Sequence, residues 1–221
     1  NYAGSATFEV SDETFEDVNY WLEALFGTAS PSGAGPYVRA YAAPTTAAVT
    51  PHFMTLQWGQ ANGVFQLQDA SVASLTLSGA DNTGIQVGGS IIGGKVTAGT
   101  YTSLNDRTGT TRMSGCMAKV SIGVWDAASL TELTDSAFSW ELSINSNREY
   151  RSYLGSCTPK AYNDQKWNGQ LKLSLELNTS TDDYLTAMLG SSSAILERQI
   201  EIKYSTTVDG KARSMTIKFA G

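Results

Sequence analysis

Few side chains in this sequence have the type and spacing that catalysis or metal binding requires. The single histidine, His52, has no second histidine with which to build a metal site or a catalytic triad. Cys116 and Cys157 stand far apart and form no Cys-x-x-Cys motif, which argues against a zinc or redox site. We therefore expect His52 to be structural. We expect the two cysteines to be independent thiols, with a single disulfide as the alternative if they meet in space.

Paired acidic residues are the remaining candidates for chemistry, because two carboxylates can act as acid and base in glycoside hydrolysis. Such pairs occur at Asp12 and Glu13, at Glu16 and Asp17, and at Asp182 and Asp183. All of them fall at expected helix starts, where carboxylates cap the backbone and interact favourably with the helix dipole. The sequence contains neither a nucleophile-elbow motif nor a phosphate-binding glycine loop. It predicts no catalytic site, no metal site and no cofactor, and so favours a structural or binding protein over an enzyme.

Two stretches that change from strand to helix periodicity organise the chain. Between Gly169 and Gly190, leucines at every second position predict a strand with one buried face, and helical spacing from Tyr184 then predicts a short helix that ends at the glycine. The segment from Gly4 to Gly27 repeats this order of strand, capped amphipathic helix and terminal glycine. We interpret the two stretches as an internal duplication.

Alternating segments elsewhere predict a mainly β fold. In 138–144, we expect Phe138 to face the core together with Trp140, Leu142 and Ile144. Asn62-Gly63 and Asp209-Gly210 predict hairpin turns. The polar segments 97–115 and 145–168 predict interface or functional loops. The other strands are expected at 37–42, 52–58, 64–68, 72–78, 116–125, 195–204 and 214–219.

Composition narrows the class of partner. The formal net charge is −6, the pI is about 4.8, and only 16% of residues are charged. An acidic balance argues against ordinary nucleic-acid binding, but it does not exclude a surface that must repel DNA so that DNA can slide past. There is no apolar run of 18 residues, so no membrane span is expected. The chain begins at Asn1, not Met, just before a strand, and we expect that a segment was removed or lies upstream.

The order of these segments resembles a bacteriophage major tail tube protein of the long, non-contractile, siphovirus-like type. The residues that carry the resemblance are GSATFEVSDETFEDVNYWLEALFG (4–27), HFMTLQW (52–58), SVASLTLSG (71–79), and the stretch 138–190 followed by the hairpin 195–219. The resemblance covers most of the chain and implies duplicated tail-tube β-sandwich or barrel modules, each with a short flanking α-helix. Residues 1–134 would form the first module, lacking the upstream strand that members usually carry, and residues 135–221 the second.

The resemblance also implies a function. It is that of a structural virion protein, assembled in the host cytoplasm, which polymerises into stacked rings that form the phage tail tube and conduct DNA during ejection. The duplication favours three chains per ring with pseudo-sixfold symmetry, and six chains are the alternative. The implied partners are further copies of the chain, a tape measure protein and a tail terminator, with DNA passing through unbound and no membrane involved.

Charged residues are assigned on the same basis. Glu9, Glu141 and Glu176 are candidates for the lumen, with Glu9 the first-half equivalent of Glu176, and outward-facing solvent positions are the alternative. Candidates for contacts between subunits or rings are Arg107, Arg112, Arg148, Arg151, Lys160 and Lys166. Two rival functions remain open: a monomeric β-sandwich adhesin or carbohydrate-binding module, and a hydrolase that uses an unrecognised carboxylate pair.

Overall fold

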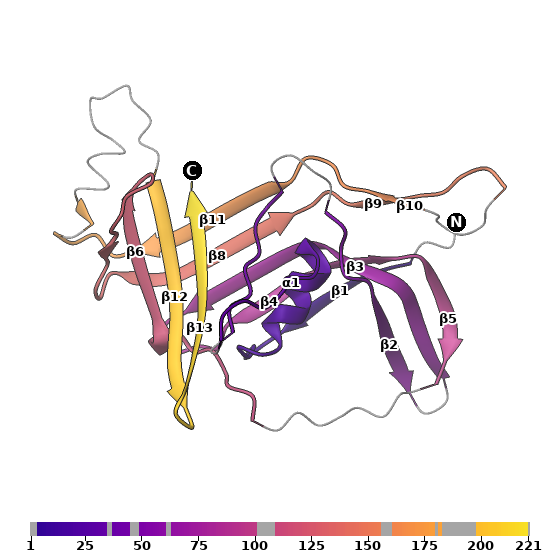
Figure 1. Ribbon diagram of the computed structural model, residues 1–221, viewed down its shortest axis with the longest axis horizontal. Coiled ribbons are helices and arrows are strands. Elements are labelled where there is room, and N and C mark those ends of the chain that lie inside the picture. Colours follow the sequence, from indigo (N-terminus) through magenta and orange to yellow (C-terminus); the bar gives the residue numbers. More distant parts are fainter. Residues whose placement is uncertain are drawn as a thin grey trace.

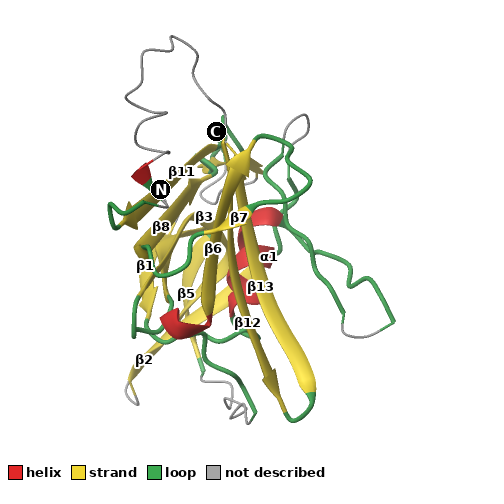
Figure 2. Ribbon diagram, turned by 90° about the vertical axis from the view of Figure 1, so that its left-hand side faces the viewer, coloured by secondary structure: helices red, strands yellow, loops and turns green. Residues whose placement is uncertain are grey.

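The computed structural model describes residues 4–34, 37–44, 49–60, 63–100, 109–155, 161–179, 181–182 and 198–220. These residues form a seven-stranded and a four-stranded antiparallel sheet, a two-stranded hairpin, and a helix beside the sheets (Figure 1). Seen from the side, the larger sheet makes one layer, and the helix and the smaller sheet together cover one of its faces (Figure 2). The large sheet therefore has one face on the core and one face that no other described element covers.

The larger sheet has seven strands. Its central path runs β1 (Gly4–Val10), β4 (Gln86–Gly93), β3 (Gly63–Ala80), β8 (Ala137–Asn145) and β11 (Asn168–Leu175), so that β1 and β11 are the two ends of this path. Two further strands, β2 (Met54–Gln60) and β5 (Lys95–Gly99), pair with the first half of β3. All these pairs are antiparallel.

Strand β3 merges two strands that the sequence predicts separately. The predicted strands 64–68 and 72–78 are parts of one 18-residue strand. Asp69, between them, has φ 51°, and the pairing of β3 with β4 shifts register between Val72 and Ser74. Such irregularities bend a strand without ending it. The first half of β3 can therefore pair with β2 and β5 while its second half pairs with β4 and β8.

In the first predicted unit, the strand, the helix and the terminal glycine are confirmed. The predicted carboxylate cap is not, because the helix has no side-chain capping hydrogen bond and no acidic residue in its first turn. Helix α1 spans Val18–Phe26, and Gly27 follows it with φ 89°, a conformation that glycine adopts without steric cost. Val18 and Leu25 are buried, and Trp21 stacks on Phe8 of β1 with ring centroids 4.0 Å apart. In the second unit, β11 is confirmed, whereas the expected helix from Tyr184 to Gly190 lies outside the described residues.

The smaller sheet has the order β13 (Lys211–Ala220), β12 (Arg198–Val208), β6 (Ala118–Val124) and β7 (Thr131–Glu132). The predicted turn at Asp209-Gly210 is confirmed, and both of its residues have positive φ. A short hairpin pairs β9 (Glu149–Arg151) with β10 (Ala161–Asn163). The 3₁₀ turn η1 (Gly115–Met117) replaces the beginning of the strand predicted at 116–125.

The core lies where the two sheets face each other. Leu75, Leu77 and Leu142 of the large sheet and Ile202 of the small sheet are buried. The indole Nε1 of Trp140 donates a hydrogen bond of 2.8 Å to Tyr204 Oη across the same layer. A Cβ added at Gly79 would lie 2.5 Å from that Tyr204 oxygen, so glycine leaves the space that the pair occupies.

Two core predictions are wrong. Leu177, the last leucine of the buried face predicted between Gly169 and Gly190, lies beyond the end of β11 and is 66% exposed. Phe138 was expected to face inward, but it is 54% exposed. Ser174 pairs with Ser139 and Leu175 pairs with Ala137, which makes Phe138 the extra residue of a β-bulge. A bulge shifts the alternation by one residue, and inward orientation resumes at Trp140 and Leu142, which are buried as predicted.

Both sheets combine strands from the two predicted modules. Strand β3 of residues 1–134 pairs with β8 of residues 135–221, and β6 pairs with β12 in the same way. The two ranges are therefore interleaved in space, and their origin in a duplication remains a prediction. Over the described parts of the chain, no helix is long and apolar enough to cross a membrane.

Candidate functional site

Among the described residues, the face of the five central strands that points away from the core carries mostly uncharged polar side chains. We call it the polar face, and the strand registers arrange it in four rows. The rows are Thr7, Ser90, Ser74, Asn145 and Asn168; Glu9, Gly88, Thr76, Ser143 and Gln170; Gln86, Ser78, Glu141 and Lys172; and Ala80, Ser139 and Ser174.

Strand alternation explains how this face arises. In β3, Leu75 and Leu77 point to the core, and the residues between and beside them, such as Thr76, point the opposite way. Two of these groups also hydrogen-bond to each other, since the Oγ atoms of Ser74 and Ser90 lie 2.6 Å apart. The result is a wall of hydroxyl and amide groups that can hydrogen-bond to water without carrying charge.

Charge on the polar face is sparse and partly cancelled. Lys172 Nζ lies 2.7 Å from Glu141 Oε1, directly across the pairing of β11 with β8. Both side chains reach solvent, with exposures of 62% for Lys172 and 40% for Glu141, at a shallow depression also lined by Ser78, Gln86 and Ser174. Glu9 lies on the same face but on β1, three strands away from β8.

Of the three acidic residues predicted for the lumen, the structure brings Glu9 and Glu141 onto one face. Glu176 is exposed just beyond the end of β11, where its backbone N–H donates to Ser136 O at 2.7 Å. Sequence reasoning placed Lys172 on the outward side of its strand but assigned it no role. Its pairing with Glu141 depends on the register between two strands, which periodicity does not predict.

The basic loop residues fall into different environments. Arg112 is exposed and lies 3.6 Å from Asp12 in an ion pair, and Arg151 and Lys166 are also exposed. Arg107 and Lys160 lie outside the described residues. These five remain predictions for contacts between subunits or rings.

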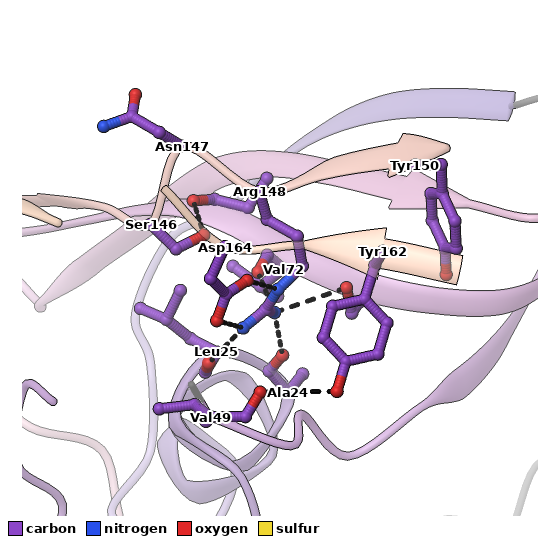
Figure 3. A network of polar contacts seen from close by, with 12 residues as sticks. Ala24, Leu25, Val49, Val72, Ser146, Asn147, Arg148, Tyr150, Tyr162 and Asp164 are labelled. Atoms are coloured by element: carbon purple, nitrogen blue, oxygen red, sulfur yellow. Dashed lines mark hydrogen bonds and ion pairs between the residues drawn. The ribbon is translucent and has the colours of Figure 1, made fainter. Parts of the chain in front are cut away.

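Arg148 does not lie where it was expected. Its side chain is fully buried within the chain, not presented to a neighbouring ring (Figure 3). Its Nε and Nη2 atoms donate to the two carboxylate oxygens of Asp164 at 2.6 and 3.1 Å. The guanidinium also donates to Leu25 O at 3.2 Å and to Val72 O at 3.0 Å. We therefore correct this prediction: Arg148 joins the β9–β10 segment to the end of α1 and to β3.

Two tyrosines anchor the same segment. Tyr150 Oη donates to Asp69 O at the bend of β3. Tyr162 Oη donates to Val49 O at 3.4 Å (Figure 3). Burial is the main cause that raises the pKa of the Tyr150 phenol to about 12, with the nearby Asp69 carboxylate adding to it. The Tyr150 hydroxyl therefore stays protonated, and able to donate, across the neutral range. The base of the predicted 145–168 loop is thus fixed to its own chain.

The remaining candidates for chemistry stand apart from one another. His52 Nδ1 lies 3.1 Å from Thr28 Oγ1. Cys116 is a free, exposed thiol, whereas Cys157 lies outside the described residues. Within the described ranges, no three His, Cys, Asp or Glu side chains gather closely enough to hold a metal ion. Glu13 is buried, and this burial raises the pKa of its carboxyl group. It packs at the start of the α1 segment, where its backbone pairs with Ile85 and Met113.

Comparison with known proteins completes the picture of the site. The family model described as "Phage tail tube protein" matches residues 1–216, almost the whole chain. None of the curated proteins matches the sequence.

Proposed function

Because the chain belongs to the phage tail tube protein family, we propose that its polar face lines the bore of the tube through which phage DNA passes. Membership makes the chain a structural component of the phage tail within the virion and not an enzyme, and it implies self-assembly into a tube. The proposal adds which surface faces inward and what that surface does.

The observation that carries the proposal is the composition of the polar face. Helix α1 and the smaller sheet cover the opposite face, so the polar face is the broad sheet surface that the described part of the chain leaves open (Figure 2). Its neutral hydroxyl and amide groups keep a layer of water, whereas DNA-binding surfaces hold phosphates with arginine and lysine. Such a wall lets a DNA duplex pass without specific contacts.

The edges of the sheet support a ring. Strands β1 and β11 end the central path and carry backbone groups that the described chain does not pair on their outer sides. Edge strands are normally protected from pairing with other chains, and in a closed ring they pair with the neighbouring subunits. We propose that β1 of one subunit lies beside β11 of the next. Three chains per ring follow if the predicted duplication is real, and six if it is not.

An apolar surface at one end of the large sheet supports further contact with a second copy. Trp58 and Phe65 stack with centroids 6.1 Å apart on β2 and β3, and they are 41% and 48% exposed. Val96 of β5 is 41% exposed beside them. Exposed aromatic clusters mark interaction sites, and a self-assembling family makes a second copy the occupant. Phe65→Ser is expected to raise the protein concentration needed for tube formation about tenfold for each 1.4 kcal/mol of contact energy lost.

The wider role follows the same family. We propose a long non-contractile tail in which a tape measure protein fills the tube during assembly and a tail terminator ends it. Neither partner is expected to need a dedicated pocket on this chain, because both act on the assembled tube.

Chemical labelling of assembled tubes tests the proposal. Thr76→Cys on the polar face and Ser205→Cys on the exposed side of β12 would each be made in a background with Cys116 and Cys157 replaced by serine. A small maleimide is expected to label both positions in intact tubes. A bulky polyethylene glycol maleimide is expected to label only Ser205→Cys. Equal labelling of both positions by the bulky reagent would place the polar face outside the bore.

A further inference from the structure

We infer that Glu141 neutralises Lys172 on the polar face, and that this masking prevents the bore from holding DNA. The inference rests on the proposed function, because it assigns a role to a charge pair on the face proposed to line the tube. It differs from the sequence-based expectation, in which Glu141 acts simply as a repelling negative charge. In this inference, the charge that must be neutralised is that of the Lys172 ammonium group.

Lys172 is the one cation among the residues that make up the rows of the polar face. It is 62% exposed, so its ammonium group can reach a passing phosphate, and Glu141 Oε1 lies 2.7 Å from it. The pair is set by the direct register of β11 on β8, not by a flexible loop. Each copy of the chain in the tube would present the same pair.

Within one chain, no other carboxylate of the described polar face is close enough to Lys172 to replace Glu141. Glu9 lies four strands from β11, or roughly 19 Å at the usual strand spacing. Glu176 lies four residues beyond Lys172, about 13 Å along an extended chain. Both distances exceed the Debye length of about 8 Å at physiological salt. Without Glu141, Lys172 would have no carboxylate of its own chain beside it on this face.

An unmasked Lys172 would affect DNA passage because every chain of the tube carries the same lysine. Duplex DNA carries one phosphate charge per roughly 1.7 Å of axis, and each contact with a cation releases counterions and strengthens binding. Lysines repeated around each ring and along the tube would therefore hold DNA at many points. Removing Lys172 itself leaves Glu141 free, and an extra carboxylate only repels phosphate.

This reasoning predicts an asymmetry that a purely structural ion pair would not produce. A surface pair contributes about 0–1 kcal/mol to stability, and removing either partner loses the same contact. If the pair only stabilises the sheet, Glu141→Gln and Lys172→Gln should behave alike. If Glu141 masks Lys172, only Glu141→Gln should hinder DNA, and the double variant should pass DNA normally.

The test compares tails carrying Glu141→Gln, Lys172→Gln or both, with tube formation checked by negative-stain microscopy. The readouts are the rate of DNA ejection and the retention of a short duplex by purified tubes at low and high salt. We expect Glu141→Gln to slow ejection roughly tenfold or more and to retain the duplex in a salt-sensitive manner. Lys172→Gln and the double variant should match the unaltered protein. Equal behaviour of the two single variants would overturn the inference.

A fourth variant separates this inference from the proposed function. Thr76→Lys adds an uncompensated cation at the centre of the same face. If Thr76→Lys also passes DNA freely, the polar face does not line the bore and the proposed function fails. If Thr76→Lys retains DNA but Glu141→Gln does not, only the masking role fails. Should Glu141→Gln alone not assemble, tubes that mix it with unaltered chains give the same readouts.

Discussion

The buried pair of Arg148 and Asp164 is expected to be a major determinant of the stability of the unassembled chain. Their side chains are 0% and 4% exposed, and they form a bidentate contact. Arg148 also satisfies Leu25 O at the end of α1 and Val72 O beside the bend of β3. Arg148→Met keeps most of the side-chain volume and removes the charge and all of its donors.

The magnitude follows from what that change leaves behind. Asp164 would become a buried carboxylate without its cation, and removing one partner of such a pair costs about 3–5 kcal/mol. For a chain of 221 residues, each kcal/mol corresponds to roughly 2–4 °C in the midpoint of thermal unfolding. We therefore expect Arg148→Met to lower that midpoint by roughly 6–20 °C. Arg148→Lys keeps the positive charge but lacks the planar guanidinium group, so it should lower the midpoint by less than Arg148→Met does.

Urea unfolding of the unassembled protein, followed by tryptophan fluorescence, measures this effect. Trp167 stacks on Phe26 with centroids 5.3 Å apart, close to the same segment, so its emission should report the loss. The double variant Arg148→Met with Asp164→Leu removes both charges and should recover part of the stability lost by Arg148→Met alone. Two results would refute a buried, coupled pair. One is a fall of less than about 1 kcal/mol in the free energy of unfolding for Arg148→Met. The other is a fall for the double variant that equals the sum of the falls for the two single variants.

Three further predictions concern the sheets and the start of the α1 segment. Gly89→Ala should lower the free energy of unfolding in urea by a few kcal/mol, because the added Cβ would lie 2.1 Å from Ser74 O. The control is the neighbouring Gly88→Ala, whose Cβ would lie 3.4 Å from its nearest atom and which should change that free energy by less than about 1 kcal/mol. Trp140→Phe should lower the free energy of unfolding by about 1–3 kcal/mol, because it leaves the buried Tyr204 hydroxyl without the indole N–H that donates to it. An unchanged free energy in the same urea assay would count against that hydrogen bond. Burial raises the pKa of Glu13 in the folded state, so the folded chain binds this proton more tightly and stability falls as pH rises from the unfolded to the folded pKa. Glu13→Gln should therefore stabilise the protein at neutral pH and lose that advantage in acid; a gain that is independent of pH would contradict this reasoning.

Local features of the chain were predictable from its sequence. The alternation in β1, β8 and β11 predicted which residues turn away from the core, because the strand period of two assigns each residue to a face. Gly27 marked the end of α1, and Asp209-Gly210 marked the turn between β12 and β13, because both positions need backbone conformations that suit few other residues. The polar character of the candidate site was thus already present in the pattern, and so was the resemblance to the family that the comparison confirms.

Other features depended on contacts between distant residues, and only the tertiary structure decided them. Periodicity assigns a residue to a face but not to a partner, so it could not pair Glu141 with Lys172 across two strands. Nor could periodicity reveal that Arg148 donates hydrogen bonds to carbonyl oxygens more than 70 residues away, at the end of α1 and in β3. The bulge at Phe138 inverted a prediction for the same reason, because one extra residue on a strand is visible only when its neighbour is in place. The sequence alone determined that one face of this sheet is polar, and the cross-strand register decided that its lysine lies against a carboxylate.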